Sequence, residues 1–328
     1  MFRKKEQKQV NQFVVDNFSN AQIEETLLSR DIASLEDAIE VEQDKFIRLQ
    51  DLKRKDELDF GLRPKEINLQ QVYFDLKRDI TSLLGVSPNI PDPKFRMNSS
   101  FNFPAVGLTL MEGTGLLHLG VCSLAILYSV DISPESLVMA VNHVALGEVG
   151  RRASLKFGSM YNPKNKKMML GQNPEATVVP TFAHELDHHV LSEVGVPYGV
   201  FSGKNKSYTL FHEGHAQGVQ RVISRQFFEG GKNEAFLYDS SKLDLMMLKK
   251  TYGWLCKKNK LQPKTELATG KTFKGMNKLF YYSLDSSERH VRGSAFFYLL
   301  EQEQGKSVYK NTLRDPAKVF SFNDIKFN

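Results

Sequence analysis

The stretch that decides the fold is Thr181-Phe182-Ala183-His184-Glu185-Leu186-Asp187-His188-His189. Histidines four residues apart on a helix lie one above the other, so the side chains of His184 and His188 can share one tetrahedral metal ion. Glu185 lies about 100° further round the helix, where its carboxylate can reach a water beside the metal without binding the metal. The stretch therefore predicts a helix with two zinc ligands and a candidate general base.

A catalytic zinc site of this kind takes a third ligand from the protein and leaves its fourth position to water. The candidates lie in a second expected helix, residues 210–229, within Phe211-His212-Glu213-Gly214-His215-Ala216-Gln217. Glu213 is the first candidate, because a carboxylate makes the site less positive. His212 and His215 remain alternatives on other faces of the helix. Gly214 lets a neighbouring element approach closely, and Gln217 is a candidate to orient a ligand imidazole.

The HExxH string, followed after a loop by a helix with Glu-Gly-x-Ala, resembles the gluzincins, the thermolysin-like and aminopeptidase-like zinc peptidases. The matching elements are His184-Glu185-Leu186-Asp187-His188 and Glu213-Gly214-His215-Ala216. The resemblance implies Zn²⁺ held by His184, His188 and Glu213, with Glu185 as general base and a peptide or protein as substrate. It covers about residues 159–310. It implies an α+β fold with a small mixed sheet, the HExxH helix and a helical C-terminal subdomain.

A third element of the resemblance precedes Gly293, where many gluzincins carry Tyr-x-x-Gly entering a later helix. His290 takes the place of that tyrosine, and in thermolysin-like members a histidine stabilises the transition-state oxyanion. The resemblance therefore implies His290 as a second catalytic residue, with Tyr281 and Tyr282 as upstream alternatives. The competing interpretation is a surface histidine at the start of an expected helix, residues 286–304. Gly293 should let this helix pass close to the metal-binding helices.

The segment before the motif predicts a β-hairpin over residues 159–171. Its return strand, residues 167–171, is similar to the edge strand that gluzincins present to an extended substrate. The metal-binding helix is expected to begin at Pro180, since a first helical turn tolerates proline, and to end before Gly195.

The N-terminal region has the periodicity of helices over residues 21–84, interrupted by Gly61 and Pro64. Its apolar positions recur at steps of four and three, with a gap at Glu42. They are Leu28, Ile32, Leu35, Ile39, Phe46 and Leu49. Because this heptad is short and broken, helices packed on the rest of the protein are favoured over a coiled coil for self-association. Self-association through these helices is kept as the alternative.

Three prolines follow the second of these helices, at Pro88, Pro91 and Pro93, and cannot continue it. We predict a domain boundary there. It separates an N-terminal helical region with its linker, residues 1–93, from a catalytic domain, residues 94–328.

The composition of the chain is that of an ordinary soluble protein with a core. Of its 328 residues, 41% are hydrophobic and 25% charged, and the net charge of +6 is spread along the chain. The basic run at residues 257–260 lacks interleaved aromatic residues, which predicts a solvated face and no nucleic-acid partner. Cys122 and Cys256 form no CxxC pattern, so no disulfide framework is expected.

No membrane association is expected either. The most apolar stretch, residues 115–130, is shorter than the about 20 residues that a spanning helix needs, and no secretory signal opens the chain. A cytoplasmic location is therefore predicted.

Three other functions are compatible with the motifs. They are a zinc hydrolase of a non-peptide amide, a DNA-associated protease, and a non-catalytic adaptor in which zinc staples two helices. The intact Glu185 argues against the adaptor, because a structural zinc site has no use for a base.

Overall fold

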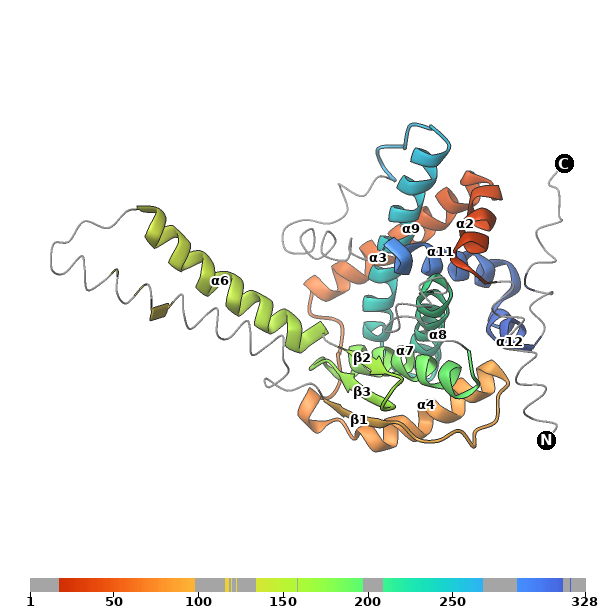
Figure 1. Cartoon of the computed structure of the whole chain (residues 1–328), viewed down its shortest axis with the longest axis horizontal. Coiled ribbons are helices and arrows are strands. Elements are labelled where there is room, and N and C mark those ends of the chain that lie inside the picture. The colour runs from red at the N-terminus through yellow and green to blue at the C-terminus, as the bar shows by residue number, and fades with distance from the viewer. Residues whose placement is uncertain are drawn as a thin grey trace.

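The computed structural model describes residues 18–97, 116, 117, 119, 122, 134–157, 159–196, 209–267, 288–314 and 319. These residues form a mostly helical body with a small mixed sheet at one side, which belongs to the broad α+β class (Figure 1). The helices are α2 (Asn20–Ser29), α3 (Ile32–Arg54), the 3₁₀ turn η1 (Pro64–Glu66), α4 (Leu69–Leu84), α6 (Pro134–Phe157), α7 (Glu175–Glu193), α8 (Thr209–Glu229), α9 (Ala235–Lys258), α11 (Glu288–Gln304) and α12 (Ser307–Arg314). The strands are β1 (Lys94–Met97), β2 (Met160–Asn162) and β3 (Lys167–Leu170).

The sheet has the strand order β1-β3-β2. The predicted hairpin is confirmed, because β2 pairs with β3 in antiparallel fashion. β1 pairs in parallel with the other side of β3, with Lys94 opposite Lys167. The expectation that the strand after the hairpin turn is an edge strand is therefore wrong, since β3 is the central strand. The reason is a partner about seventy residues upstream, which no local pattern of the hairpin encodes.

Helix α7 begins at Glu175 and not at Pro180, so this predicted boundary is wrong. Its first amides find acceptors in the loop after α3. The N–H of Glu175 donates to the carbonyl of Leu62, and that of Ala176 to the carbonyl of Phe60, both at 3.1 Å. These tertiary hydrogen bonds satisfy the helix start, so the helix extends past a proline that lacks an N–H of its own.

The N-terminal helices pack on the rest of the protein, as favoured from the short heptad. The apolar face of α3 is buried, and α3 packs against α9. The gap in its stripe is also buried: Glu42 is 2% exposed and accepts a hydrogen bond of 2.9 Å from the hydroxyl of Tyr298 on α11. One core contains side chains from both sides of residue 93. The proposed domain division stays a prediction.

Helices α8 and α11 approach each other unusually closely, and both glycines expected to permit close packing lie at this crossing. A Cβ atom built on Gly214 would lie 2.8 Å from the Cα of Gly293. One built on Gly293 would lie 2.9 Å from the Cα of Leu210. Only glycine fits at either position, because a Cβ atom would overlap the facing backbone.

Two long helices had no specific signal in the sequence analysis. α9 lies in the body between α3 and α8, whereas α6 extends away from the body in Figure 1. Several apolar side chains of α6 are exposed, among them Val138 and Val141. Of the apolar run 115–130, only residues 116, 117, 119 and 122 are described. Within the described part of the chain, no helix is both long and apolar enough to cross a bilayer.

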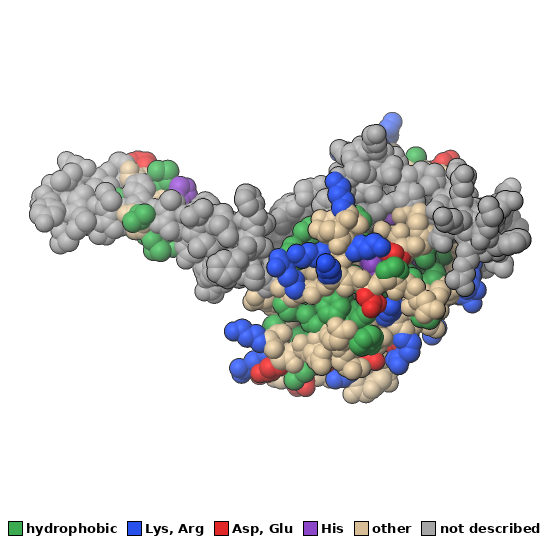
Figure 2. All heavy atoms as spheres, turned by 60° about the horizontal axis from the view of Figure 1, so that its bottom comes forward, with side chains coloured by type: hydrophobic (Ala, Val, Ile, Leu, Met, Phe, Trp, Pro, Cys, Tyr) green, Lys and Arg blue, Asp and Glu red, His purple; other side chains and the backbone are tan. Residues whose placement is uncertain are grey.

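The surface charge is divided among several places. Figure 2 turns the lower face of Figure 1 forward and shows Lys and Arg side chains at separate positions, with Asp and Glu among them. This face therefore presents mixed charge around hydrophobic and neutral surface.

Candidate metal centre

The structure brings His184, His188 and Glu213 together between two packed helices. The histidines lie on α7 and the glutamate on α8, and one ligand atom of each lies within 4.8 Å of the other two. The Nε2 atoms of His184 and His188 lie 3.4 and 3.5 Å from the same oxygen, Oε2 of Glu213. The two imidazole rings are perpendicular, with centroids 4.8 Å apart.

These separations fit a bound metal ion better than direct hydrogen bonds. Ligand atoms at about 2.0–2.1 Å from a tetrahedral zinc ion lie about 3.3–3.4 Å from one another. Direct N–H···O hydrogen bonds cluster at about 2.9–3.0 Å, so 3.4 and 3.5 Å are long for such bonds. The donor set of two imidazoles and one carboxylate can hold a metal ion.

The site is buried but open on one side. The side chains of His188 and Glu213 are 3% and 8% exposed, whereas that of His184 is 17% exposed. Burial by itself would lower the pKa of His184, but the carboxylates of Glu213 and Glu185 outweigh it and raise that pKa. The surroundings of the ligands are therefore negative, which favours a cation.

Glu185 lies between the metal ligands and the sheet. Its carboxylate is buried, and burial raises its pKa, while the neighbouring imidazoles and a hydrogen bond from the backbone of Tyr161 offset part of that shift. Tyr161 is the middle residue of β2, opposite Met168 of β3. A strand amide that bonds Glu185 must point away from β3. The strand beside the candidate base is therefore β2.

The other candidates on α8 lie outside the ligand group. His212 is buried, with its ring centroid 6.3 Å from that of His188. The Nδ1 atom of His215 is 2.8 Å from Oδ2 of Asp187 on α7, so this ring is engaged in a different contact.

Gln217 was expected to hydrogen-bond the imidazole of a metal ligand. Its side-chain N–H groups make no such bond to Nδ1 of His184. Among the described residues, Nδ1 of His184 and Nε2 of Gln217 both lack a hydrogen-bond partner. Gln217 lies four residues after Glu213, so both side chains lie on the same face of α8. This spacing does not determine which side chain of α7 Gln217 contacts.

The role of His290 stays a prediction. Its backbone opens α11, but its side chain lies outside the described part of the structure, as do Tyr281 and Tyr282. The structure describes the crossing of α11 and α8, one turn after His290, where Gly293 contacts Leu210 and Gly214 of α8. The first turn of α11 therefore lies beside the segment that carries Glu213.

Two side chains of the motif helix have roles that the sequence analysis missed, Asp187 and His189. The ring of His189 bridges the hydroxyl of Tyr161, 3.0 Å from Nδ1, and the carbonyl of Pro91, 2.7 Å from Nε2. It thereby ties α7 to β2 and to the segment before β1. The signal was the run of three charged or imidazole side chains after Leu186, Asp187-His188-His189, of which HExxH explains only His188.

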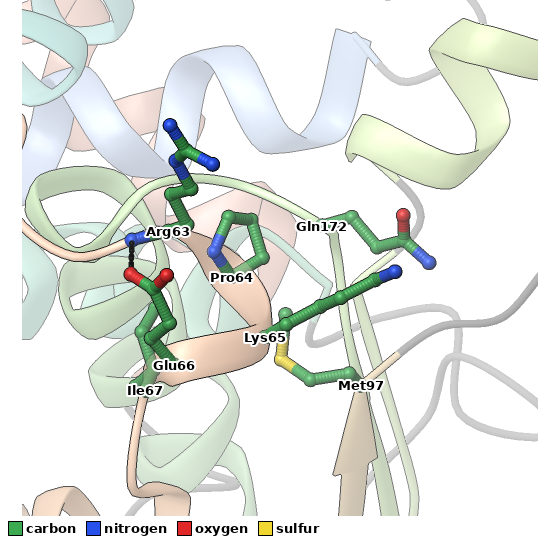
Figure 3. A pocket seen from close by; sticks show the side chains of 7 residues that line it. All are labelled: Arg63, Pro64, Lys65, Glu66, Ile67, Met97 and Gln172. Carbon is green, nitrogen blue, oxygen red and sulfur yellow. Dashed lines mark hydrogen bonds between the residues drawn. The ribbon is translucent and has the colours of Figure 1, made fainter.

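A hollow of about 660 Å³ lies apart from the ligand group, at the ends of β1 and β3 (Figure 3). Its lining residues are Arg63, Pro64, Lys65, Glu66, Ile67, Met97 and Gln172. Glu66 turns back to accept a 3.3 Å hydrogen bond from the backbone N–H of Arg63, which closes η1 locally. None of the ligand-group residues lines this hollow.

Comparison with protein-family models, curated proteins and solved structures finds no match to this chain. What the site can do is therefore argued from its own geometry.

Proposed function

We propose that the protein is a zinc-dependent peptidase of gluzincin type. The observation that carries the proposal is the convergence of two imidazole nitrogens on one carboxylate oxygen at 3.4 and 3.5 Å, with a buried carboxylate next to them in sequence. Three nitrogen and oxygen ligands with one open side are the donor set of hydrolytic zinc sites.

His184, His188 and Glu213 would hold the ion, and the 17% exposure of His184 marks the side from which a substrate enters. A zinc ion there supplies a Lewis acid that polarises a carbonyl group and makes a water molecule acidic enough to attack it.

Glu185 is proposed as the general base. Its carboxylate would take a proton from the water as the C–O bond forms, and would pass it to the nitrogen of the amine, which then leaves as the C–N bond breaks. Burial supports this role, because a carboxylate with a raised pKa holds a proton more readily than an exposed one.

An extended peptide is proposed to lie along the outer edge of β2. No described strand pairs with that edge, and the backbone N–H of Tyr161 donates a hydrogen bond to Glu185 there. A peptide added to this edge would place its backbone beside the base. His290, one turn before the Gly293 crossing, is proposed to donate a hydrogen bond to the developing oxyanion.

The test combines metal analysis with a peptide-library digest of the wild-type protein and Glu185→Gln. We expect one zinc ion per chain in both proteins and cleavage only by the wild type. Zinc without peptide cleavage would favour a zinc-stapled adaptor or a hydrolase of another amide. Absence of bound metal after loading with zinc would contradict the proposal.

A further inference from the structure

Asp187 and His215 form a buried pair across the two ligand-bearing helices. Both side chains are 0% exposed, and Oδ2 of Asp187 lies 2.8 Å from Nδ1 of His215. Asp187 belongs to α7 and His215 to α8. Neither is part of the group that could hold the metal.

The pair lies next to the ligands in both segments. Asp187 directly precedes the ligand His188, and His215 follows the ligand Glu213 by two residues. A hydrogen bond between these positions ties the two ligand-bearing turns at one point. Sliding or rotating one helix against the other would break this bond and change the 3.4 and 3.5 Å separations at the metal site.

The ring of His215 is itself held from other helices. It packs edge-on against Phe297 of α11 and Tyr309 of α12, each with a centroid 5.4 Å away. Phe211 of α8 packs against it at 5.5 Å. Because three rings enclose this imidazole, the Asp187 carboxylate meets a partner whose orientation is fixed.

Burying the Asp187–His215 pair lowers the stability of the fold unless another interaction offsets the lost solvation. Within the described residues, Oδ1 of Asp187 and Nε2 of His215 have no hydrogen-bond partner. A buried carboxylate with a single hydrogen bond loses more solvation than it regains, and apolar side chains would join two helices at lower cost. Asp187 directly precedes the ligand His188, so its negative charge would attract a dication held by the ligands.

We infer that Asp187 and His215 are positioning residues for the metal: their hydrogen bond holds the ligands of α7 and α8 in register, and the Asp187 carboxylate favours a bound dication. This inference rests on the proposed function, because it assumes that the ligand group binds a metal. Neither residue touches the substrate or the reacting atoms. Loss of an outer partner of this kind typically lowers metal affinity by about 10- to 100-fold.

The experiment measures zinc affinity by chelator competition and the visible spectrum of the Co²⁺-loaded protein for the wild type and four variants. Asp187→Asn keeps an acceptor for His215 and removes the charge. His215→Ala removes the hydrogen bond, and His215→Gln restores a donor. Asp244→Asn is the matched control, because Asp244 is as buried and contacts α8 at Arg221, 2.6 Å away and two turns beyond the ligand Glu213.

We expect Asp187→Asn and His215→Ala to bind zinc about 10- to 100-fold more weakly, with a changed Co²⁺ spectrum. His215→Gln should recover part of the affinity, and Asp244→Asn should bind like the wild type. Unchanged affinity and spectrum in Asp187→Asn and His215→Ala would overturn the inference while leaving the proposed function intact. An equal loss in Asp244→Asn would overturn it too, as general destabilisation. A wild type that binds no metal would instead refute the proposed function.

Discussion

At the scale of single residues, we expect metal binding and proton transfer to depend on different side chains. Glu185→Gln keeps the shape of the side chain and its hydrogen-bonding capacity but removes the base. We expect this variant to bind zinc like the wild type and to lose most turnover, because proton transfer by a placed group contributes about 100- to 10,000-fold. Peptide cleavage by the variant at the wild-type rate, measured at saturating zinc, would refute the role of Glu185.

The ligand assignment is a second prediction at this scale. His184→Ala and Glu213→Ala each remove one of three donor atoms and are expected to lower zinc affinity by orders of magnitude. His212→Gln is the control, since His212 is buried next to Glu213 but lies outside the ligand group. Chelator competition measures all three variants. Loss of zinc in His212→Gln with retention in Glu213→Ala would reverse the assignment.

At the scale of elements, the crossing of α8 and α11 determines whether the third ligand lies in place. Gly293→Ala puts a methyl group into the backbone of Leu210, so the helices must separate. We expect a loss of stability of at least about 3 kcal/mol, the range seen for severe overpacking. The free energy of unfolding in urea measures this loss.

Gly253→Ala is the matched control for this substitution. Gly253 also lies within a helix, α9, but an added Cβ atom there would meet nothing within 4 Å. Alanine in an open helix position is expected to stabilise the protein by up to about 1 kcal/mol. Equal effects of the two substitutions would show that helix propensity, and not the close crossing, explains the result.

At the scale of the whole molecule, buried charged side chains from four helices interact around Arg221. Arg221 of α8 donates hydrogen bonds to Asp244 of α9, at 2.6 Å, and to Glu301 of α11, at 2.9 Å. Burial raises the pKa of Asp244 to about 7; Arg221 opposes this shift, and Glu42 of α3 adds to it. Two smaller effects are that Lys45 lowers the pKa of Asp244 and Glu301 raises it.

This pKa predicts how stability depends on pH. Between pH 3.8 and about 7 the folded protein retains a proton on Asp244 that the unfolded chain releases. The contribution of Asp244 to the free energy of unfolding is therefore fully present below pH 3.8. It is lost as the pH rises to about 7, by up to about 1.4 kcal/mol per pH unit. Urea unfolding of the metal-free wild type and Asp244→Asn across this range measures it. A constant difference between the two proteins would contradict the prediction.

The N-terminal helices belong to the same scale, because their apolar faces cover the body. Leu35, Ile39 and Phe46 of α3 are at most 2% exposed in a structure where α3 packs on α9. Without residues 1–93 the face of α9 that packs on α3 would be exposed to solvent. The free energy of unfolding would fall by about 1.5–3 kcal/mol for each large apolar side chain whose burial is lost. We expect residues 94–328 alone to unfold at a lower urea concentration than the whole chain and to keep their zinc affinity. A transition without cooperativity, or loss of zinc binding after refolding with zinc, would contradict the division at residue 93.

The sequence by itself determined the features that are encoded within a few turns of chain. The four-residue spacing of His184 and His188 places both imidazoles on one face of any helix that forms. The hairpin of β2 and β3 follows from its own turn residues, and α4 ends where Gly85 adopts a φ of 63°. Glu213 was the first candidate for the third ligand on chemical grounds, and the resemblance to gluzincins favoured it further over His212 and His215.

Only the tertiary structure decided what these local elements meet. β3 became the central strand because β1 pairs with it from far upstream, and α7 begins before Pro180 because the loop at Phe60 accepts its first amide hydrogens. Asp187 and His215 are unremarkable on their own helices and acquire a role only when α7 packs against α8. Contacts of this kind depend on how the whole chain buries its apolar faces together, and no short stretch of sequence carries that information.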